Sequence, residues 1–542
     1  MATRLLVAAA LLLPLIGCGP QADPNPMRAP GATNSTSVDA SGTVLSPGVP
    51  GVTRTATSGE PATSEPQTPY NTSFWETVQV QDDKVGFAHT RIHPEPAFDK
   101  DALVIESRQV VRLRRYDQET RQEISVTSTE TRDGRLLHFQ ARVTSGAEVT
   151  RTNGAVRDGK LKLRTWIEDK PEGAEERDVD WPADATGMYG VNLSLIAKPL
   201  KARETRTIKS LMPIFNQIAE TTLVAEGFES LRVLGESRQL LKIRRTDRLG
   251  ERKVDSTVWM DENGEVLKTF MPLPPPGFST VRTTEGQAVA ESASAAFDLG
   301  RASVVQLNAP IPNSHGTQLV VYEAKAKSGV LEGLFPSDEV QQVMGRNPAA
   351  VMITVHAIRP DTPRAAPGVI RAAPGPASSN PSRLVQSDDP AVVELAQSVA
   401  PDETDPAKLA FALEKHVKAT ITEKNFSQAL TSAAEVAKSR EGDCTEHAVL
   451  LAALCRARKL PCDVVVGLVY AESLGGFGFH MWNEAWVGDR WVPLDATLGR
   501  GGIGAAHIKL ATSPLAGDDS WNAFLPVFQV LGRLELRVAK VE

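Results

Sequence analysis

The chain has 542 residues, which at ordinary domain sizes corresponds to about three or four structural units. It contains 59 lysines and arginines against 66 aspartates and glutamates, so its formal net charge is −7. This acidic balance argues against binding nucleic acid or anionic lipid by charge. The four cysteines are too few for a fold built on disulfide bonds.

The first residues predict a secretion signal. Arg4 precedes an apolar run over residues 5–17, which is too short to span a bilayer but fits the core of a signal peptide. The run ends at residues 15–18 (LIGC), which resembles the lipobox of bacterial lipoproteins, whose signal peptidase cuts before the cysteine. The resemblance implies that residues 1–17 are removed and that Cys18 carries the lipid. An ordinary secretory signal with a chance cysteine is the alternative.

The expected location is the cell envelope, with the membrane as a partner through the lipid anchor and no nucleic acid partner. Gly19 after the cysteine resembles the outer-membrane sorting pattern of enteric bacteria, so the periplasmic face of the outer membrane is favoured over the inner membrane. Residues 18–70 are rich in Pro, Ser, Thr, Gly and Ala. Because they cannot bury enough apolar surface to offset chain entropy, we expect a disordered spacer.

Residues 71–280 are predicted to form an antiparallel β-rich domain, because apolar and polar residues alternate and turn-forming dipeptides recur. Residues 281–359 are a second β-rich region on the same grounds. Four dipeptides tolerate the positive φ of tight turns and are expected to close hairpins: Asp133-Gly134, Asn153-Gly154, Asp158-Gly159 and Asn263-Gly264.

Residues 360–385 are rich in proline and alanine and are predicted to be a semi-rigid linker. The pattern changes in residues 386–542, where helical periodicity appears over 390–400 and 405–420. The predicted fold class is therefore α+β, with antiparallel β-rich domains followed by a mixed C-terminal domain.

A candidate nucleophile lies in residues 442–454 (GDCTEHAVLLAAL). A glycine followed by an apolar helix places Cys444 in the first helical turn. There, unpaired backbone amides and the positive end of the helix dipole favour the thiolate. His447, one turn later, is a rival base, but packing or hydrogen bonding beneath the site is the favoured interpretation.

A candidate base and its orienting acid follow in residues 480–497. A two-residue turn at Gly488-Asp489 would close a hairpin and make His480 and Asp495 diagonal neighbours on one face. Asp495 could then orient the imidazole and stabilise its charged form. A three-residue loop would place Asp495 on the opposite face.

Four blocks in this order resemble the transglutaminase-like superfamily: residues 442–448 (GDCTEHA), 458–467 (RKLPCDVVVG), 480–486 (HMWNEAW) and 490–497 (RWVPLDAT). The resemblance covers about residues 388–510 and implies a papain-related α+β core. It assigns the nucleophile to Cys444, the base to His480 and the orienting acid to Asp495. Residues 459–462 (KLPC) depart from the Gly-Ile-Pro-Ala that the family commonly has.

Other residues near these blocks have open roles. The backbone amide of Cys444 should contribute to an oxyanion hole, and a side-chain donor is sought among Asn425, Gln428 and Ser432. Trp482 is predicted to line the cleft. Cys455 and Cys462 are interpreted as buried thiols rather than a disulfide, and the cysteine spacing does not match a zinc site, so no metal is expected.

Two functions from different classes fit these residues. The leading hypothesis is a cysteine acyl-transfer enzyme that cleaves or exchanges amide bonds of peptides or proteins through a thioester on Cys444, without a cofactor. The sequence leaves hydrolysis and transamidation open. The alternative is a catalytically idle envelope scaffold or binding lipoprotein, because over half of the chain lies outside the triad-bearing domain.

Overall fold

The structure, a computed structural model, describes residues 68–80, 83–115, 118–145, 148–250, 252–272, 277–290, 298–327, 329–359, 370–425, 430–516, 524–530 and 532–542. The predicted signal peptide, Cys18, nearly all of the spacer, Gln428 and residues 360–369 of the predicted linker lie outside these residues. Within the described segments, no helix combines the length and the apolar character needed to cross a membrane.

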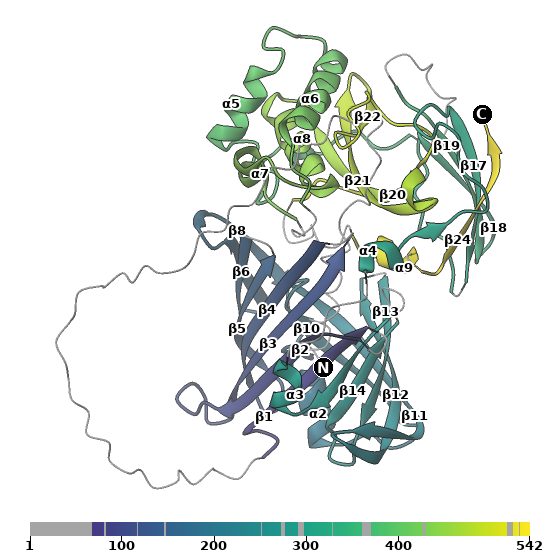
Figure 1. The fold of residues 1–542 in the computed structure, drawn as a ribbon. Coiled ribbons are helices and arrows are strands. Elements are labelled where there is room, and N and C mark those ends of the chain that lie inside the picture. Colours follow the sequence, from purple (N-terminus) through teal and green to yellow (C-terminus); the bar gives the residue numbers. More distant parts are fainter. Residues whose placement is uncertain are drawn as a thin grey trace, which may run out of the picture.

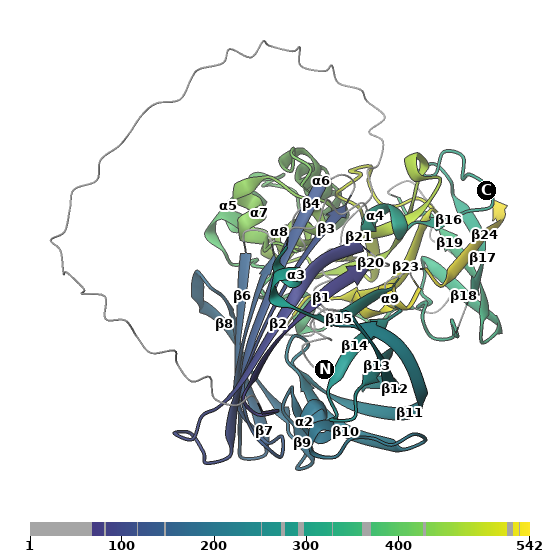
Figure 2. The same ribbon diagram turned by 60° about the horizontal axis from the view of Figure 1, so that its bottom comes forward.

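Fifteen strands form one large curved sheet in which two meanders meet at β1 and β15 (Figures 1 and 2). Side-chain alternation explains the strands: β7 (KLKLRTWI) exposes and buries successive residues, so that one face can pack. Neighbouring strands are antiparallel except β9 and β10, which confirms the predicted antiparallel β-rich region. The strands are β1 (Thr72–Val80), β2 (Asp83–Pro94), β3 (Ala102–Arg115), β4 (Gln118–Thr131), β5 (Leu136–Ser145), β6 (Glu148–Arg157), β7 (Lys160–Ile167), β8 (Lys170–Asp180), β9 (Ala185–Thr186), β10 (Thr205–Met212), β11 (Gln217–Val233), β12 (Glu236–Leu249), β13 (Arg252–Met260), β14 (Val266–Met271) and β15 (Phe278–Thr283).

One of the four predicted hairpin turns is wrong. Asn153 and Gly154 lie inside β6 rather than at its end. A Cβ atom on Gly154 would lie 2.2 Å from Cε1 of Phe139, so this glycine makes room for a buried ring and not for a turn. The other three dipeptides join consecutive strands, each with its glycine at positive φ: Asp133-Gly134, Asp158-Gly159 and Asn263-Gly264.

The remaining strands form two smaller sheets, with orders β16-β21-β20-β23, plus β22 beside β21, and β18-β19-β17-β24. Strand β17 pairs with β24 near the C-terminus. The second β-rich region and the C-terminal region therefore share a sheet, and the predicted linker does not separate them; a pairing this distant leaves no local pattern. The strands are β16 (Val305–Gln306), β17 (Leu319–Ala326), β18 (Gln341–Asn347), β19 (Ala350–His356), β20 (Cys462–Ala471), β21 (Gly476–Val487), β22 (Arg490–Leu494), β23 (His507–Ser513) and β24 (Leu534–Val541).

The part of the predicted linker that the structure describes, residues 370–385, packs on the C-terminal region. Arg371 forms ion pairs with Asp463 and Glu484, and its Nη1 lies 2.7 Å from Glu484 Oε2. Its guanidinium carbon lies 3.9 Å from the ring centre of Trp491, whose Nε1 donates to the carbonyl oxygen of Ala372. This segment is therefore a fixed part of the fold and not a spacer.

The longer helices of the C-terminal region begin at the aspartates that the sequence offers as caps. Asp389, Asp405 and Asp443 accept hydrogen bonds from backbone N–H groups at the starts of α5, α6 and α8, and proline follows the first two. The helices are α2 (Gly190–Ala197), α3 (Glu285–Val289), α4 (Leu299–Ala302), α5 (Pro390–Ser398), α6 (Pro406–Thr420), α7 (Ala433–Ser439), α8 (Cys444–Ala457) and α9 (Leu525–Val530), with short 3₁₀ turns η2 (Pro376–Ser378) and η3 (Glu472–Leu474).

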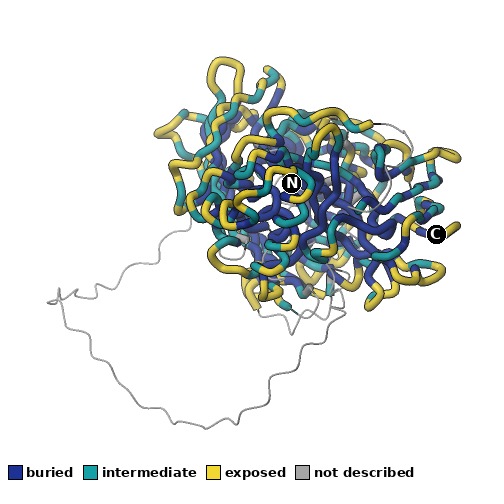
Figure 3. Tube along the Cα trace, turned by 90° about the horizontal axis from the view of Figure 1, so that it is seen from above, coloured by how far each residue is buried: buried dark blue, intermediate teal, exposed yellow. Residues whose placement is uncertain are grey.

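The large sheet and the C-terminal region are in contact. A buried apolar cluster contains residues of both, and the interior is visible as dark blue tube in Figure 3. Polar contacts add to it: Glu148 Oε2 accepts from the backbone N–H of Ser432 at 3.3 Å, and Glu175 Oε1 accepts from that of Arg383 at 2.9 Å. The sheet therefore contacts the segment that leads into α7 and α8.

Candidate active site

Cys444 is the first residue of α8, and its position follows from the local sequence. Asp443 caps the helix, because its side chain accepts from the backbone N–H of Thr445 while Glu446 reaches back to the N–H of Asp443. The sulfur of Cys444 therefore sits at the start of a helix, where the positive end of the helix dipole favours negative charge. Helix α8 packs on β21, where Asn483 Nδ2 donates to the carbonyl oxygen of Ala448 at 2.9 Å.

The predicted two-residue turn between β21 and β22 is confirmed. Val487 pairs with Arg490 and the register continues to Asn483 and Leu494, while Gly488 supplies a φ of +68°. Asp495 directly follows β22. This register brings Asp495 Oδ2 to 2.7 Å from His480 Nε2, and both side chains are fully buried.

The Asp495 carboxylate accepts hydrogen bonds on both oxygens. Oδ1 accepts from the backbone N–H groups of Thr497 and Leu498 at 3.0 and 3.2 Å, and Oδ2 lies near ring nitrogens of His480 and His507. Burial opposes ionisation, but the charge of His480 and the hydrogen bonds of both histidines outweigh it and hold the pKa of Asp495 well below its usual value. The carboxylate is therefore ionised and fixed in orientation.

The surroundings of His447 make it unsuited to act as the rival base. Its Nδ1 lies 2.6 Å from the carbonyl oxygen of Asp443, and burial lowers the pKa of His447 to about 4. The ring is therefore neutral near pH 7 and its Nδ1 is already engaged by the helix start. This contact matches the favoured interpretation of hydrogen bonding beneath the site.

The candidates for the oxyanion hole and the cleft lie in different places. Trp482 is buried, its ring centre lies 6.0 Å from that of His480, and no described residue accepts a hydrogen bond from its Nε1. Ser432 directly precedes α7 and donates its backbone N–H to Glu148, while Asn425 donates to Glu441. Trp482 is therefore the predicted residue that the structure brings to His480.

Two residues of this site were missed by sequence reasoning. Glu414 Oε1 accepts from the backbone N–H of Asp495 at 2.8 Å, and burial raises the pKa of Glu414 to about 8. Glu414 follows Leu413 in the apolar stripe of the predicted helix, and this position could have indicated a buried acid. His507 Nε2 lies 3.1 Å from Asp495 Oδ2, and no local sequence pattern predicts this contact.

Among the residues that the structure describes, His480, Asp495 and His507 could together hold a metal ion, since their ligand atoms lie within 4.8 Å of one another. Both ring nitrogens already lie at hydrogen-bonding distance from the same carboxylate oxygen. This spacing favours a hydrogen-bonded cluster over metal ligation. Cys455 and Cys462 are buried free thiols, as predicted, and burial raises the pKa of Cys462 well above its usual value.

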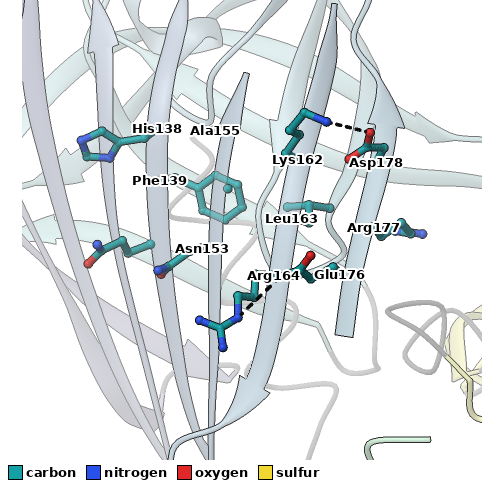
Figure 4. Close-up of a pocket in the computed structure, with 12 residues that line it drawn as sticks. His138, Phe139, Asn153, Ala155, Lys162, Leu163, Arg164, Glu176, Arg177 and Asp178 are labelled. Atoms are coloured by element: carbon teal, nitrogen blue, oxygen red, sulfur yellow. Dashed lines mark hydrogen bonds and ion pairs between the residues drawn. The ribbon is translucent and has the colours of Figure 1, made fainter. Parts of the chain in front are cut away.

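A groove of about 440 Å³ lies elsewhere, on strands β5 to β8 of the large sheet (Figure 4). Four of its charged side chains form two ion pairs: Lys162 Nζ lies 2.9 Å from Asp178 Oδ2, and Arg164 Nε lies 3.9 Å from Glu176 Oε1. Such exposed pairs on a sheet surface are typical of a solvated face.

Comparisons with known proteins agree with the family suggested by the sequence blocks. The family model of the transglutaminase-like superfamily matches residues 393–496, whereas no curated protein matches the chain. Three solved structures are similar at low TM-scores. They are a candidate cysteine protease from Cytophaga hutchinsonii (18% identity, 42% of this chain and 89% of the other, TM-score 0.27), a β-barrel-like protein from Brucella abortus (14%, 39% and 92%, 0.28) and the periplasmic domain of TgpA from Pseudomonas aeruginosa (17%, 38% and 87%, 0.24). The C-terminal part of the chain thus contains a transglutaminase-like domain, with the family match at residues 393–496.

Proposed function

We propose that the C-terminal region is a cysteine acyl-transfer enzyme that acts on amide bonds of peptides or proteins. The observation that carries the proposal is the buried pair of His480 Nε2 and Asp495 Oδ2 at 2.7 Å. This pair engages Nε2, so the proton exchange with a thiol would run through Nδ1, the other ring nitrogen of His480. Cys444, at the start of the helix that packs on the same strand, would supply that thiol in its reduced form.

The reaction follows from these roles. The thiolate of Cys444 attacks the carbonyl carbon of an amide, and a carbon–sulfur bond forms while the carbon–nitrogen bond breaks. His480 gives its proton to the departing amine, and Asp495 stabilises the charged imidazole until then. Water then releases a carboxylic acid, or a second amine forms a new amide; both routes regenerate the thiol.

The backbone N–H of Cys444, at the helix start, would stabilise the negative oxygen of the tetrahedral intermediate. The indole N–H of Trp482 is a second candidate donor, because it is buried beside His480 and meets no acceptor within the described part of the chain. A buried unpaired donor is costly unless a ligand or substrate engages it.

The location of this activity follows from the N-terminal sequence. The lipid on Cys18 would anchor the protein in the cell envelope, with the periplasmic face of the outer membrane favoured by Gly19. The spacer over residues 18–70 would hold the folded part at a distance from the membrane. Peptides or proteins of the envelope are the substrates that this location makes available.

The test is the rate of alkylation of Cys444 by iodoacetamide as a function of pH, with modified sites located by mass spectrometry. We expect Cys444 to react well below the free-thiol pKa of about 8.5 and to lose that reactivity in His480→Ala. Cys455 and Cys462 are internal references, because buried thiols react slowly. His356→Ala, on β19, is the matched control. If Cys444 is as inert as the references, the idle scaffold becomes the better description.

A further inference from the structure

His507 is a buried histidine whose two ring nitrogens both face oxygen atoms. Its Nε2 lies 3.1 Å from Asp495 Oδ2, and its Nδ1 lies 3.2 Å from the carbonyl oxygen of Gly504. The residue begins β23, outside the family match at residues 393–496. Asp495 Oδ2 is therefore shared by ring nitrogens from two different strands.

The turn before His507 is fixed by a part of the chain far away in sequence. The backbone N–H of Ala505 donates to the carbonyl oxygen of Thr317 at 3.1 Å, and Tyr322 Oη donates to the carbonyl oxygen of Ala505 at 2.9 Å. Because β23 also pairs with β20, the ring has little freedom to move away from Asp495. A side chain held this firmly can fix the group that it touches.

The rings around His507 contain titratable groups that bear on its charge. Its ring centre lies 5.8 Å from that of His480, 5.3 Å from Trp482 and 6.5 Å from His315. Burial lowers the pKa of His507, and it lowers the pKa of His315 to about 4, where the nearby charge of Arg500 acts in the same direction.

Asp495 is thus the negative charge beside a neutral His507. The carboxylate is a stronger acceptor than a peptide carbonyl, so the single ring proton of His507 belongs on Nε2.

We propose that His507 is a positioning residue of this active site, which fixes Asp495 Oδ2 by a second ring N–H and draws part of the carboxylate charge away from His480. The inference rests on the proposed function. Without this donor the carboxylate can rotate, and its undivided charge binds the protonated ring of His480 more strongly. The rate should fall, and the basic limb of the pH profile should move to higher pH.

Three substitutions separate hydrogen bonding from packing. His507→Gln places an amide N–H where Nε2 lies, whereas His507→Asn places one where Nδ1 lies and offers nothing to Asp495. His507→Phe keeps the ring and removes both donors. We expect alkylation of Cys444 at neutral pH to fall about 10- to 100-fold in His507→Asn and His507→Phe, with the basic limb about half a unit to one unit higher, and to stay within about threefold in His507→Gln.

Equal losses in the Gln and Asn variants, or an unchanged pH profile in His507→Asn, would overturn the proposal in favour of a packing role. A second measurement does not depend on a reactive cysteine. In Cys444→Ala protein with ¹⁵N-labelled histidine, we expect two low-field ring N–H resonances in proton NMR, both lost in Asp495→Asn and one lost in His507→Asn. A single resonance that responds to Asp495→Asn would exclude the second donor, even if the proposed function itself fails.

Discussion

The large sheet and the C-terminal region both bury charged side chains, but they arrange them differently. In the sheet, Arg245 and Asp247 lie two residues apart on β12 and form a buried ion pair at 2.7 Å, to which Thr221 of the next strand adds a hydrogen bond. In the C-terminal region, the two histidine partners of the Asp495 side chain come from β21 and β23, and Glu414 of α6 accepts a hydrogen bond from the backbone N–H of Asp495.

This difference shows what distinguishes a functional site from a protein core whose buried polar groups are merely paired. A local pair such as Arg245 and Asp247 neutralises itself within one or two strands, and the fold needs no further element to hold it. The groups around Asp495 meet only because several elements are ordered at once, and each ordered residue costs chain entropy. Convergence of buried polar groups from separate elements is therefore the stronger sign of function.

The largest expected effect comes from the same substitution in both regions. Asp495→Asn should lower the alkylation rate of Cys444 about a thousandfold at neutral pH, because the amide nitrogen would face a ring N–H and the charge would be lost. Asp247→Asn should leave that rate unchanged and lower the free energy of unfolding by about 3 kcal/mol, since it leaves Arg245 without its counter-charge. Chemical denaturation of both variants measures their free energies of unfolding. Loss of Cys444 reactivity in folded Asp247→Asn would contradict it.

Glu414 gives the second largest effect, on stability. Burial raises the pKa of Glu414 to about 8, so the folded protein holds a proton that the unfolded chain releases above about pH 4.5. The stabilisation is present at low pH and is lost as pH rises toward 8, by on the order of 4 kcal/mol. Glu414→Gln should remove this slope when unfolding is measured from pH 4 to 9. Glu394→Gln, on exposed α5, should behave as wild type, and an unchanged slope in Glu414→Gln would contradict the assignment.

Two glycines, one in each region, allow the same comparison with a smaller expected effect. A Cβ on Gly467 would lie 2.2 Å from the carbonyl oxygen of Ile508 and 2.6 Å from the ring of Trp482, whereas one on Gly154 would meet Phe139. Alanine at each position should cost about 1–3 kcal/mol through overpacking. Only Gly467→Ala should also slow alkylation of Cys444, about tenfold, because it displaces the strands beside His480. Gly227→Ala, which meets open space, should change neither quantity.

The smallest effect is expected in the groove of Figure 4. Lys162→Ala breaks an exposed ion pair with Asp178 and should change the free energy of unfolding by less than about 1 kcal/mol. Alkylation of Cys444 should remain at the wild-type rate. A change in that rate would mean that the sheet surface communicates with the site.

The parts of the site that could be predicted are those set by neighbours in sequence. The turn at Gly488 fixes the register that brings Asp495 to His480, and Asp443 caps the helix that starts at Cys444. His507 could not be found, because its approach to Asp495 depends on β23 pairing with β20.

The same distinction holds for the fold. Strand alternation revealed the antiparallel sheet, but Gly154 was misread as a turn because its role is to admit the ring of Phe139 from the neighbouring strand. The sheet shared by β17 and β24 could not be predicted either, since it joins segments that lie on either side of the transglutaminase-like domain in the sequence.

The central claim is that Cys444 is a thiolate paired with His480 near neutral pH. The most direct measurement is the ultraviolet absorbance of the thiolate, taken as the difference between wild type and Cys444→Ala across a pH titration. We predict a midpoint about two units below the free-thiol value of about 8.5, and a shift of that midpoint upward in His480→Ala. A midpoint at or above 8.5 that does not respond to His480→Ala would contradict the account.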